Sequence, residues 1–375
     1  MNNWIYSQST KIIFETGAMK RIAAILEENQ LKNGVLVADP FFARSGLADQ
    51  IVANAQGKLI AVFSEVEPNP TVFNVNACAD LLRDVKAEFV LALGGGSSMD
   101  CAKAASTLCT LPAGSTIRTY HGTGVALPAT HLPLICVPTT AGTGSEVTGV
   151  AVLSDPELGK KAPIGCPNFY AAYALIDPEL TVSVPAKVTA ATGLDVLCHA
   201  IEGYWSTGHQ PICDACAVHA LHLVFDYLPR AVADGHDIEA REKMCEASVI
   251  AGLAFNLPKT TSSHACSFPL TTMFHIPHGE ACAMTIDYFA RVNKDAQGGR
   301  VQPLATDLGF ADVDAMADRI AEMKKEFGLR TDLKDFHLDD ETFDKLVAAS
   351  HHPNMLNNPV EITDEILRDM YGKMR

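Results

Sequence analysis

Apolar residues in the first half of the chain fall in short runs of the length expected for buried strands. These runs cover residues 11–14, 35–39, 59–63, 89–96 and 132–138. The stretches between them, such as GAMKRIAAILEEN and VNACADLLRDVK, carry apolar residues at helical spacing. This alternation of strands and helices predicts a parallel sheet with helices on both faces.

The pattern changes after about residue 180, beyond which nearly every segment has helical periodicity. The expected helices cover residues 187–206, 211–230, 238–255, 278–293, 312–327 and 361–373. We therefore expect an α/β domain at residues 1–182 and an all-helical domain at residues 183–375. Ligands favour clefts between domains, so we expect the active site there.

The composition excludes several classes of protein. A formal net charge of −15 argues against a nucleic-acid partner, because phosphate binding needs a basic face. No signal peptide is recognisable, and no apolar run is long enough for a membrane span. The 11 cysteines lack paired spacing, apart from Cys213 and Cys216 on one face of an expected helix. The sequence thus predicts a soluble cytoplasmic protein with free thiols.

Three consecutive glycines follow an apolar strand in LALGGGSSMDCAKAAS. Gly95 and Gly96 let the backbone approach a ligand closely. Ser97 and Ser98 open a helix, whose first N–H groups and positive dipole end favour phosphate. A tight strand-to-helix turn without any ligand would explain the same residues, so both interpretations stay open.

Two further features after strands suit a dinucleotide. The loop VPTTAGTGSEVT, which contains Thr139 and Thr140, is rich in hydroxyl groups and could wrap a diphosphate or a nicotinamide ring. Asp39 ends the strand GVLVAD, where a carboxylate can bind a ribose diol and repel a 2′-phosphate, favouring NAD over NADP. A helix N-cap or a turn is the alternative role of Asp39.

One carboxylate and several imidazoles have a spacing suited to a metal. Asp195 and His199 lie four residues apart on one face of an expected helix, and His264, His275 and His278 follow. Alone, such an Asp and His pair would more often be a buried structural pair than a metal site. With the later histidines they form a nitrogen and oxygen ligand set suited to Fe(II), Zn(II) or a similar ion. Because no cysteine is needed, a structural zinc site is disfavoured.

Several motifs occur together in the order seen in one enzyme family. They include EPNPT at residues 67–71, GGGSSMD at 94–100, PTTAGTGSE at 138–146, GLDVLCHAIE at 193–202 and HIPHG at 275–279. With them the chain resembles the iron-containing (group III) alcohol dehydrogenases, whose fold is similar to that of dehydroquinate synthase. The resemblance implies the metal ligands Asp195, His199, His264 and His278, and assembly into dimers or larger homo-oligomers. It implies the cofactor-binding residues Asp39, Gly95, Gly96, Ser97, Ser98, Thr139, Thr140 and Lys161.

The chain departs from this family after the third predicted ligand. Many members read HxxxHPLG there, whereas this chain reads HACSFPLT, so Phe268 replaces an imidazole close to the active site. A proton relay at that position is therefore lost. His275, a bound water or the cofactor ribose hydroxyls could carry the proton instead, and we take His275 as the candidate catalytic residue.

The segment before His264 departs as well. It reads LPKTTSSH, which places Lys259 and four hydroxyl groups within five residues of a predicted ligand. This segment is either a polar helix start with an exposed lysine or a pocket for phosphonate, sulfonate or carboxylate oxygens. The pattern is similar to that of phosphonoacetaldehyde reductases and, by extension, sulfoacetaldehyde reductases. Lys259 and Phe268 are thus the candidate substrate-binding residues.

The sequence therefore predicts an NAD(H)-dependent alcohol dehydrogenase that uses Fe(2+), or Zn(2+) or another divalent ion, and reduces a small aldehyde. The segment around Lys259 favours an anionic two-carbon aldehyde. The alternative is a generalist short-chain dehydrogenase for propanol, butanol or propanediol and lactaldehyde. More remote alternatives are a dehydroquinate synthase-type lyase and a non-enzymatic component of an assembly.

Overall fold

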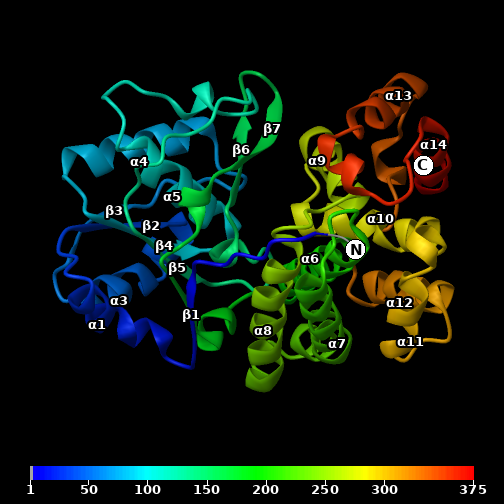
Figure 1. Ribbon diagram of the computed structural model, residues 1–375, viewed down its shortest axis with the longest axis horizontal. Helices are drawn as coiled ribbons and strands as arrows, with labels where there is room; N and C mark the ends of the chain where they lie inside the picture. Colours follow the sequence, from blue (N-terminus) through cyan, green and yellow to red (C-terminus); the bar gives the residue numbers. More distant parts are fainter. Residues whose placement is uncertain (1–2) are drawn as a thin grey trace. The chain divides into compact units, whose positions relative to one another are not determined.

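The computed structural model describes residues 3–375, which pack into two compact units (Figure 1). The α/β unit comprises residues 7–140 and 144–181. The helical unit comprises residues 182–375, residues 141–143 and the N-terminal segment that ends at Tyr6. The main division thus falls between Thr181 and Val182, whereas no periodic pattern had indicated that residues 141–143 belong to the helical unit.

A six-stranded sheet forms the centre of the α/β unit, and all of its neighbouring strands are parallel. The strand order is β1–β8–β5–β4–β2–β3, and β6 and β7 form a separate antiparallel pair. The strands are β1 (Lys11–Phe14), β2 (Gly34–Ala38), β3 (Leu59–Phe63), β4 (Phe89–Gly94), β5 (Leu134–Pro138), β6 (Val150–Asp155), β7 (Lys160–Gly165) and β8 (Tyr173–Ile176).

Alternate residues of the central strands enter two separate apolar layers. Val35 and Val37 of β2 pack with the helices α4 and α5, whereas Leu36 and Ala38 pack with α1 and α3. Figure 1 shows these two pairs of helices on opposite sides of the sheet. The helices of this unit are α1 (Ile22–Glu28), α2 (Pro40–Arg44), α3 (Leu47–Asn54), α4 (Val72–Asp84) and α5 (Gly96–Leu108). Its 3₁₀ segments are η1 (Ala18–Arg21), η2 (Ile117–Thr119), η3 (Ser145–Val147), η4 (Pro167–Phe169) and η5 (Pro178–Thr181).

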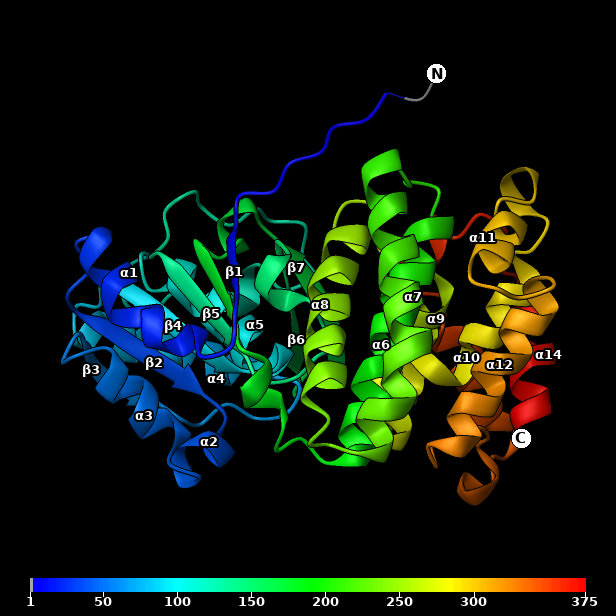
Figure 2. The same ribbon diagram turned by 90° about the horizontal axis from the view of Figure 1, so that it is seen from below.

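The helical unit is built around α6, which is buried along nearly its whole length. The helices α7 and α8 lie alongside it (Figure 2), and α9 and α10 also contact it. The helices are α6 (Ala186–Trp205), α7 (Pro211–Ala233), α8 (Ile238–Phe255), α9 (Ser262–Phe274), α10 (His278–Val292), α11 (Val301–Asp307), α12 (Val313–Glu326), α13 (Asp340–Ala349) and α14 (Asp364–Met374). Its 3₁₀ segments are η6 (Ala296–Gly298), η7 (Lys334–Phe336) and η8 (Pro353–Asn357).

The predicted fold class, a parallel α/β region followed by a helical region, is confirmed. Within residues 3–375, no helix combines the length and the apolarity that crossing a membrane would require.

Candidate active site

Three polar side chains of α6 are buried on one side of that helix. Asp195, His199 and Glu202 follow one another at intervals of four and three residues, so they share a face. Their exposed fractions are only 2%, 5% and 0%. Burial of three such groups is costly unless each finds a polar partner or a cation.

His264 lies in the first turn of α9 and is held by Glu202. Its Nδ1 donates to Glu202 Oε2, and the same carboxylate accepts hydrogen bonds from Thr261 Oγ1 at 2.8 Å and Ser263 N at 2.6 Å. In the neutral ring Nδ1 carries the proton, and the lone pair of this imidazole therefore lies on Nε2. That atom lies 3.5 Å from Asp195 Oδ1. Glu202 therefore orients the ring as an outer carboxylate orients a metal-binding histidine.

His278 is the first residue of α10 and brings a second oriented imidazole to the group. The Ser267 hydroxyl donates to His264 O at 2.7 Å, so it accepts from His278 Nδ1 at 3.2 Å. The lone pair of His278 consequently lies on Nε2. The His264 and His278 ring centroids are 5.5 Å apart. Close approach of α10 to α6 depends on Gly279, since a Cβ there would lie 2.3 Å from Ala191 O.

Several buried polar atoms in this cluster form no hydrogen bond with any described residue. They are Asp195 Oδ1, His199 Nδ1 and His264 Nε2. A divalent cation would satisfy a carboxylate oxygen and imidazole lone pairs together, so the residues fit a metal ion such as Fe(II) or Zn(II).

The protonation states of Asp195 and His199 also fit a metal. Burial opposes ionisation of Asp195, but His199, His264 and His278 outweigh it and hold the pKa of that carboxyl well below its usual range. Burial lowers the pKa of His199 to about 4, although Asp195 partly opposes this shift. At neutral pH the pair is thus an ionised carboxylate beside a neutral imidazole, the forms that bind metals.

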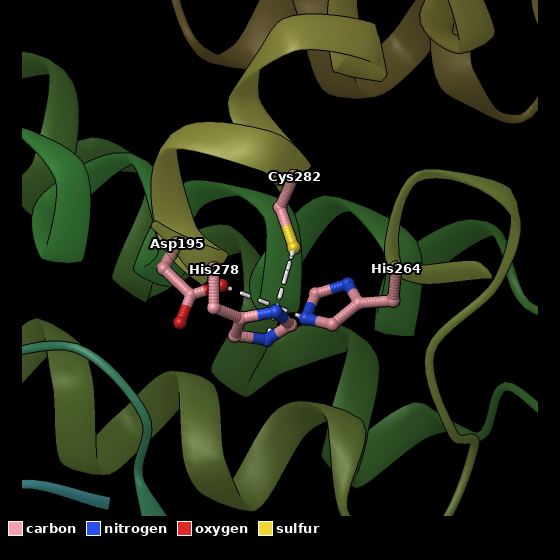
Figure 3. A group of neighbouring side chains, drawn as sticks. All are labelled: Asp195, His264, His278 and Cys282. Atoms are coloured by element: carbon pink, nitrogen blue, oxygen red, sulfur yellow. Dashed lines mark hydrogen bonds and ion pairs between the residues drawn. The ribbon is translucent and has the colours of Figure 1, made fainter. Parts of the chain in front are cut away.

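The geometry adds one residue that the sequence did not single out. Ligand atoms of Asp195, His264, His278 and Cys282 all lie within 4.8 Å of one another, and Figure 3 shows their side chains pointing toward a common centre. His199 lies beside this group, with Nδ1 4.0 Å from Asp195 Oδ1 and its ring stacked on Phe255. Burial raises the pKa of Cys282, which keeps the weakly binding thiol form. His199 therefore remains the predicted fourth ligand.

Phe268 and His352 form an aromatic pair next to the histidine cluster. Phe268 lies one turn after His264 in α9, and its ring centroid is 6.5 Å from that of His278. His352, which precedes η8, packs on Phe268 with ring centroids 4.3 Å apart. Sequence reasoning missed His352, because no local spacing connects it to residues some 80 positions earlier.

The hydroxyl-rich segment before His264 is mostly engaged in structural bonds. Thr260 Oγ1 accepts from Asn354, Thr261 Oγ1 donates to Glu202, and Ser262 Oγ donates to Asn358. Ser263 Oγ is buried and has no hydrogen-bond partner among the described residues. Lys259 is exposed, has a left-handed φ of 71° and donates to Asn256 O of its own turn at 2.6 Å. A role of Lys259 in substrate binding stays a prediction.

His275 lies at the C-terminal end of α9 in the left-handed conformation, with φ 56°. It is exposed and lines a pocket of about 420 Å³ together with Lys187 and Arg330. None of the predicted metal ligands lines this pocket. The structure therefore does not bring His275 into the ligand cluster, and its predicted catalytic role stays a prediction.

The predicted phosphate-binding residues gather where β4 meets α5. Gly94 has φ 143°, and a Cβ there would lie 2.5 Å from Ser98 Oγ. Gly95 is the N-cap of α5 and supplies no side-chain cap, so the first N–H groups of the helix are left for an anion. A Cβ on Gly95 would lie 3.1 Å from Thr140 Oγ1, which brings the hydroxyl-rich loop beside this helix start.

Asn69 connects two of the predicted cofactor residues. Its backbone N donates to Ser97 Oγ at 3.2 Å, and its Oδ1 accepts from Lys161 Nζ at 2.8 Å. The ammonium of Lys161 is thereby held near the N-terminus of α5. Asn69 lies in the EPNPT motif, which could have indicated this role.

Asp39 has the structural role that the sequence left open. It is the N-cap of α2, and its Oδ1 accepts from Phe41 N at 2.6 Å. The second carboxylate oxygen forms no hydrogen bond with the described part of the chain, and Asp39 follows the buried strand β2. Capping and binding of a ribose hydroxyl are therefore compatible. Thr139, also after a strand, is buried and donates its N–H to Gly94 O.

Both halves of the chain match sequence profiles of one family. The profile described as "Iron-containing alcohol dehydrogenase" matches residues 9–178, and "Fe-containing alcohol dehydrogenase family, C-terminal" matches residues 189–374. Alcohol dehydrogenase 4 of Schizosaccharomyces pombe is 34% identical over 366 residues, covering 96% of this chain and 86% of that protein.

Solved structures agree with these matches. The sulfoacetaldehyde reductase of Bifidobacterium kashiwanohense, solved in complex with NAD+, is 57% identical with a TM-score of 0.97. The alignment covers 100% of this chain and 99% of that one. A 1-propanol dehydrogenase of Salmonella typhimurium is 36% identical over 313 residues, covering 83% of this chain and 80% of that protein. The resemblance expected from the motifs is confirmed, and the chain belongs to the iron-containing alcohol dehydrogenase family.

Proposed function

We propose that this protein is an NADH-dependent reductase of sulfoacetaldehyde, forming 2-hydroxyethanesulfonate. The observation that carries the proposal is the 57% identity, over the whole chain, to a sulfoacetaldehyde reductase bound to NAD+. The sequence around Lys259 is similar to that of reductases of anionic two-carbon aldehydes, which agrees with the same substrate class. We place the enzyme in the cytoplasm, since its 11 cysteines are free thiols. The family resemblance implies a homodimer or larger homo-oligomer.

Asp195, His199, His264 and His278 would hold the metal, with Glu202 and Ser267 fixing the orientation of two of the rings. When bound there, a divalent ion acts as a Lewis acid toward the carbonyl oxygen of the substrate. Phe268 contributes an apolar ring close to His278, which excludes water from that side of the reacting group.

The helix start at Gly95, Gly96, Ser97 and Ser98 would bind the diphosphate of NAD, and Lys161 would add a positive charge. Asp39 would bind the ribose through the oxygen that does not cap α2, and Thr139 and Thr140 would lie toward the nicotinamide. Bound nicotinamide supplies the hydride. The proposed reaction thus uses groups from both units.

The test is NADH oxidation by the Fe(II)-loaded protein, prepared without oxygen, on matched aldehydes. Sulfoacetaldehyde and phosphonoacetaldehyde are compared with propanal, butanal and lactaldehyde, and zinc-loaded protein is measured in parallel. We expect kcat/KM for sulfoacetaldehyde to exceed that for propanal at least 100-fold. Equal or better activity on propanal would refute the proposal and make the protein a generalist short-chain alcohol dehydrogenase.

Two variants assign the predicted roles of Lys259 and His275. If Lys259 binds the anion, Lys259→Ala raises KM for sulfoacetaldehyde, whereas the surface control Lys243→Ala, whose ammonium pairs with Glu246, does not. If His275 relays the proton, His275→Asn lowers kcat at least about 100-fold. His337 is its matched control, because it is also exposed and left-handed at the end of a helical segment. Unchanged kcat in His275→Asn assigns the relay to water or to a ribose hydroxyl.

A further inference from the structure

His352 combines a fixed ring with a nitrogen that no described residue binds. Its Nδ1 accepts a hydrogen bond from Asn354 N at 3.2 Å, so the proton of the neutral ring lies on Nε2. Burial lowers the pKa of His352 and so favours this neutral form, although Asn354 partly opposes the shift. In residues 3–375 no protein atom forms a hydrogen bond with Nε2, which leaves a donor for a ligand.

The segment that carries His352 is anchored to the residues that lead into α9, the helix that carries His264. Asn354 Nδ2 donates to Thr260 Oγ1 at 2.8 Å, and Asn357 Nδ2 donates to Thr260 O at 3.0 Å. One residue further along, Asn358 accepts from Ser262 Oγ at 3.1 Å. These bonds fix His352 relative to the predicted metal ligands more firmly than a surface loop would be fixed.

His352 is connected to the ligand cluster through one aromatic ring, a position that suits the far end of a short substrate. The Phe268 ring is a neighbour of both His352 and His278, with centroid distances of 4.3 Å and 6.5 Å. A donor one aromatic ring away from a metal ligand is too distant for the atom bound to the metal. It is at a suitable distance for the acidic group of a two-carbon aldehyde whose carbonyl is at the metal.

We propose that His352 Nε2–H binds a sulfonate oxygen of the substrate and so determines the preference for an anionic aldehyde. The inference rests on the proposed function and assigns its specificity to a residue outside the sequence motifs of the family. Phe268 then serves a second purpose, because its ring supports the face of the imidazole that binds the sulfonate.

The experiment compares His352→Ala, His352→Gln and the neighbouring control His351→Ala. His351 is exposed and bonded to Asp364 Oδ1 at 2.6 Å, so its loss tests a nonspecific effect on this segment. The quantities measured are kcat and KM for sulfoacetaldehyde and for propanal. A hydrogen bond to a charged group is worth about 10- to 100-fold. We expect the ratio of kcat/KM for sulfoacetaldehyde to that for propanal to fall by about this factor in His352→Ala, through KM.

A binding measurement provides a readout without turnover. Ethanesulfonate, which has no reacting group, is titrated into the metal-loaded protein by calorimetry. We expect weaker binding to His352→Ala, partial recovery in His352→Gln because its amide keeps a donor, and wild-type binding in His351→Ala. Far-UV circular dichroism identifies any variant that fails to fold. If His352→Ala fails to fold, the affinity of His352→Gln for ethanesulfonate tests the proposal instead.

The outcomes separate the two proposals. If the wild-type protein prefers sulfoacetaldehyde and His352→Ala keeps both the preference and the affinity for ethanesulfonate, the inference is wrong and the proposed function stands. An equal loss for both aldehydes would make His352 a structural residue and would also overturn the inference. If the wild-type protein itself has no preference for sulfoacetaldehyde, the proposed function fails.

Discussion

Glu202 holds His264 through a charged hydrogen bond while being fully buried itself. Replacing it by glutamine preserves the volume but removes the charge that fixes the imidazole tautomer. We expect Glu202→Gln to weaken metal affinity about 10- to 100-fold, as loss of such outer carboxylates does. Competition between the protein and a chromophoric chelator for Zn(II) measures this change directly.

Glu242 is the control for this substitution, since it is an exposed glutamate of the neighbouring helix α8. Glu242→Gln should bind Zn(II) as the wild-type protein does. Unchanged affinity in Glu202→Gln would show that His264 is oriented by its own backbone segment and not by the carboxylate.

Local spacing explains which site residues the sequence could reveal. Asp195 and His199 were predicted because both lie on one face of one helix, and His278 because it opens another helix in a known motif. Glu202 lies on the same face as Asp195, but its partner His264 is 62 residues away, so no local pattern indicated their bond. His352 is further still from Phe268. Such contacts depend on tertiary packing, which a single sequence does not display.

At the scale of elements, the contact of α10 with α6 is set by one glycine. An alanine at Gly279 would place its Cβ 2.3 Å from Ala191 O and 3.1 Å from Asp195 Cβ, and the backbone atom cannot move aside. We expect Gly279→Ala to lower the free energy of unfolding by about 1–3 kcal/mol. Because α10 begins with His278, metal affinity should fall too. Urea unfolding monitored by fluorescence and chelator competition measure the two effects.

Gly372 provides the matched control, because it lies in α14 and a Cβ at this position would have no described atom within 4 Å. Gly372→Ala should stabilise the protein by up to about 1 kcal/mol through its higher helix propensity. If Gly279→Ala and Gly372→Ala changed the free energy of unfolding alike, a side chain at residue 279 would be tolerated and Gly279 would not be needed for the contact of α10 with α6.

The burial pattern of each strand or helix determines whether the sequence could reveal it. The strands β2 and β4 are buried on both faces, so their continuous apolar runs were evident in the sequence. The pair β6 and β7 was missed, because β6 alternates buried and half-buried residues and β7 contains a proline. Helix α9 was missed because hydroxyl groups open it and Pro269 lies inside it, so its pattern resembles a loop.

Glu146 in η3 makes the stability of the α/β unit depend on pH. Burial raises the pKa of its carboxyl to about 7, although its own backbone N–H and Lys103 partly oppose the shift. Between about pH 4.5 and 7 the folded protein keeps a proton that the unfolded chain has released. Stability therefore falls as pH rises through this range and stays lower above it.

Glu146→Gln should remove this dependence. We expect the variant to be more stable than the wild-type protein at pH 8, by up to about 3 kcal/mol, and to differ little at pH 4.5. Urea unfolding followed by far-UV circular dichroism at the two pH values measures the difference. Glu157 is an exposed glutamate paired with Arg118, and the stability of Glu157→Gln relative to wild type should not change in this way between the two pH values. If Glu146→Gln and wild type differed in free energy of unfolding by the same amount at both pH values, Glu146 would not be the source of the pH dependence.

At the scale of the whole molecule, the two units can be observed separately. The chain has two tryptophans, Trp4 and Trp205, and both belong to the helical unit. Trp205 is fully buried and donates to Thr261 Oγ1, which in turn donates to Glu202. Tryptophan fluorescence therefore reports unfolding of the helical unit beside the predicted metal ligands, whereas far-UV circular dichroism reports both units.

This difference allows the predicted metal and NAD to be assigned to their units. A ligand at a thousandfold its Kd stabilises the unit that binds it by about 4 kcal/mol. We expect metal loading to raise the urea midpoint seen by fluorescence. NAD added to metal-free protein should raise the urea midpoint of the α/β unit, which circular dichroism reports, and leave the midpoint seen by fluorescence unchanged. If NAD shifted the fluorescence midpoint as much as the metal did, then either the units unfold together or the helical unit contributes to NAD binding. Gly94→Ala is the control for the predicted NAD site, because the strain it introduces at the start of α5 should abolish the NAD effect and leave the effect of the metal intact.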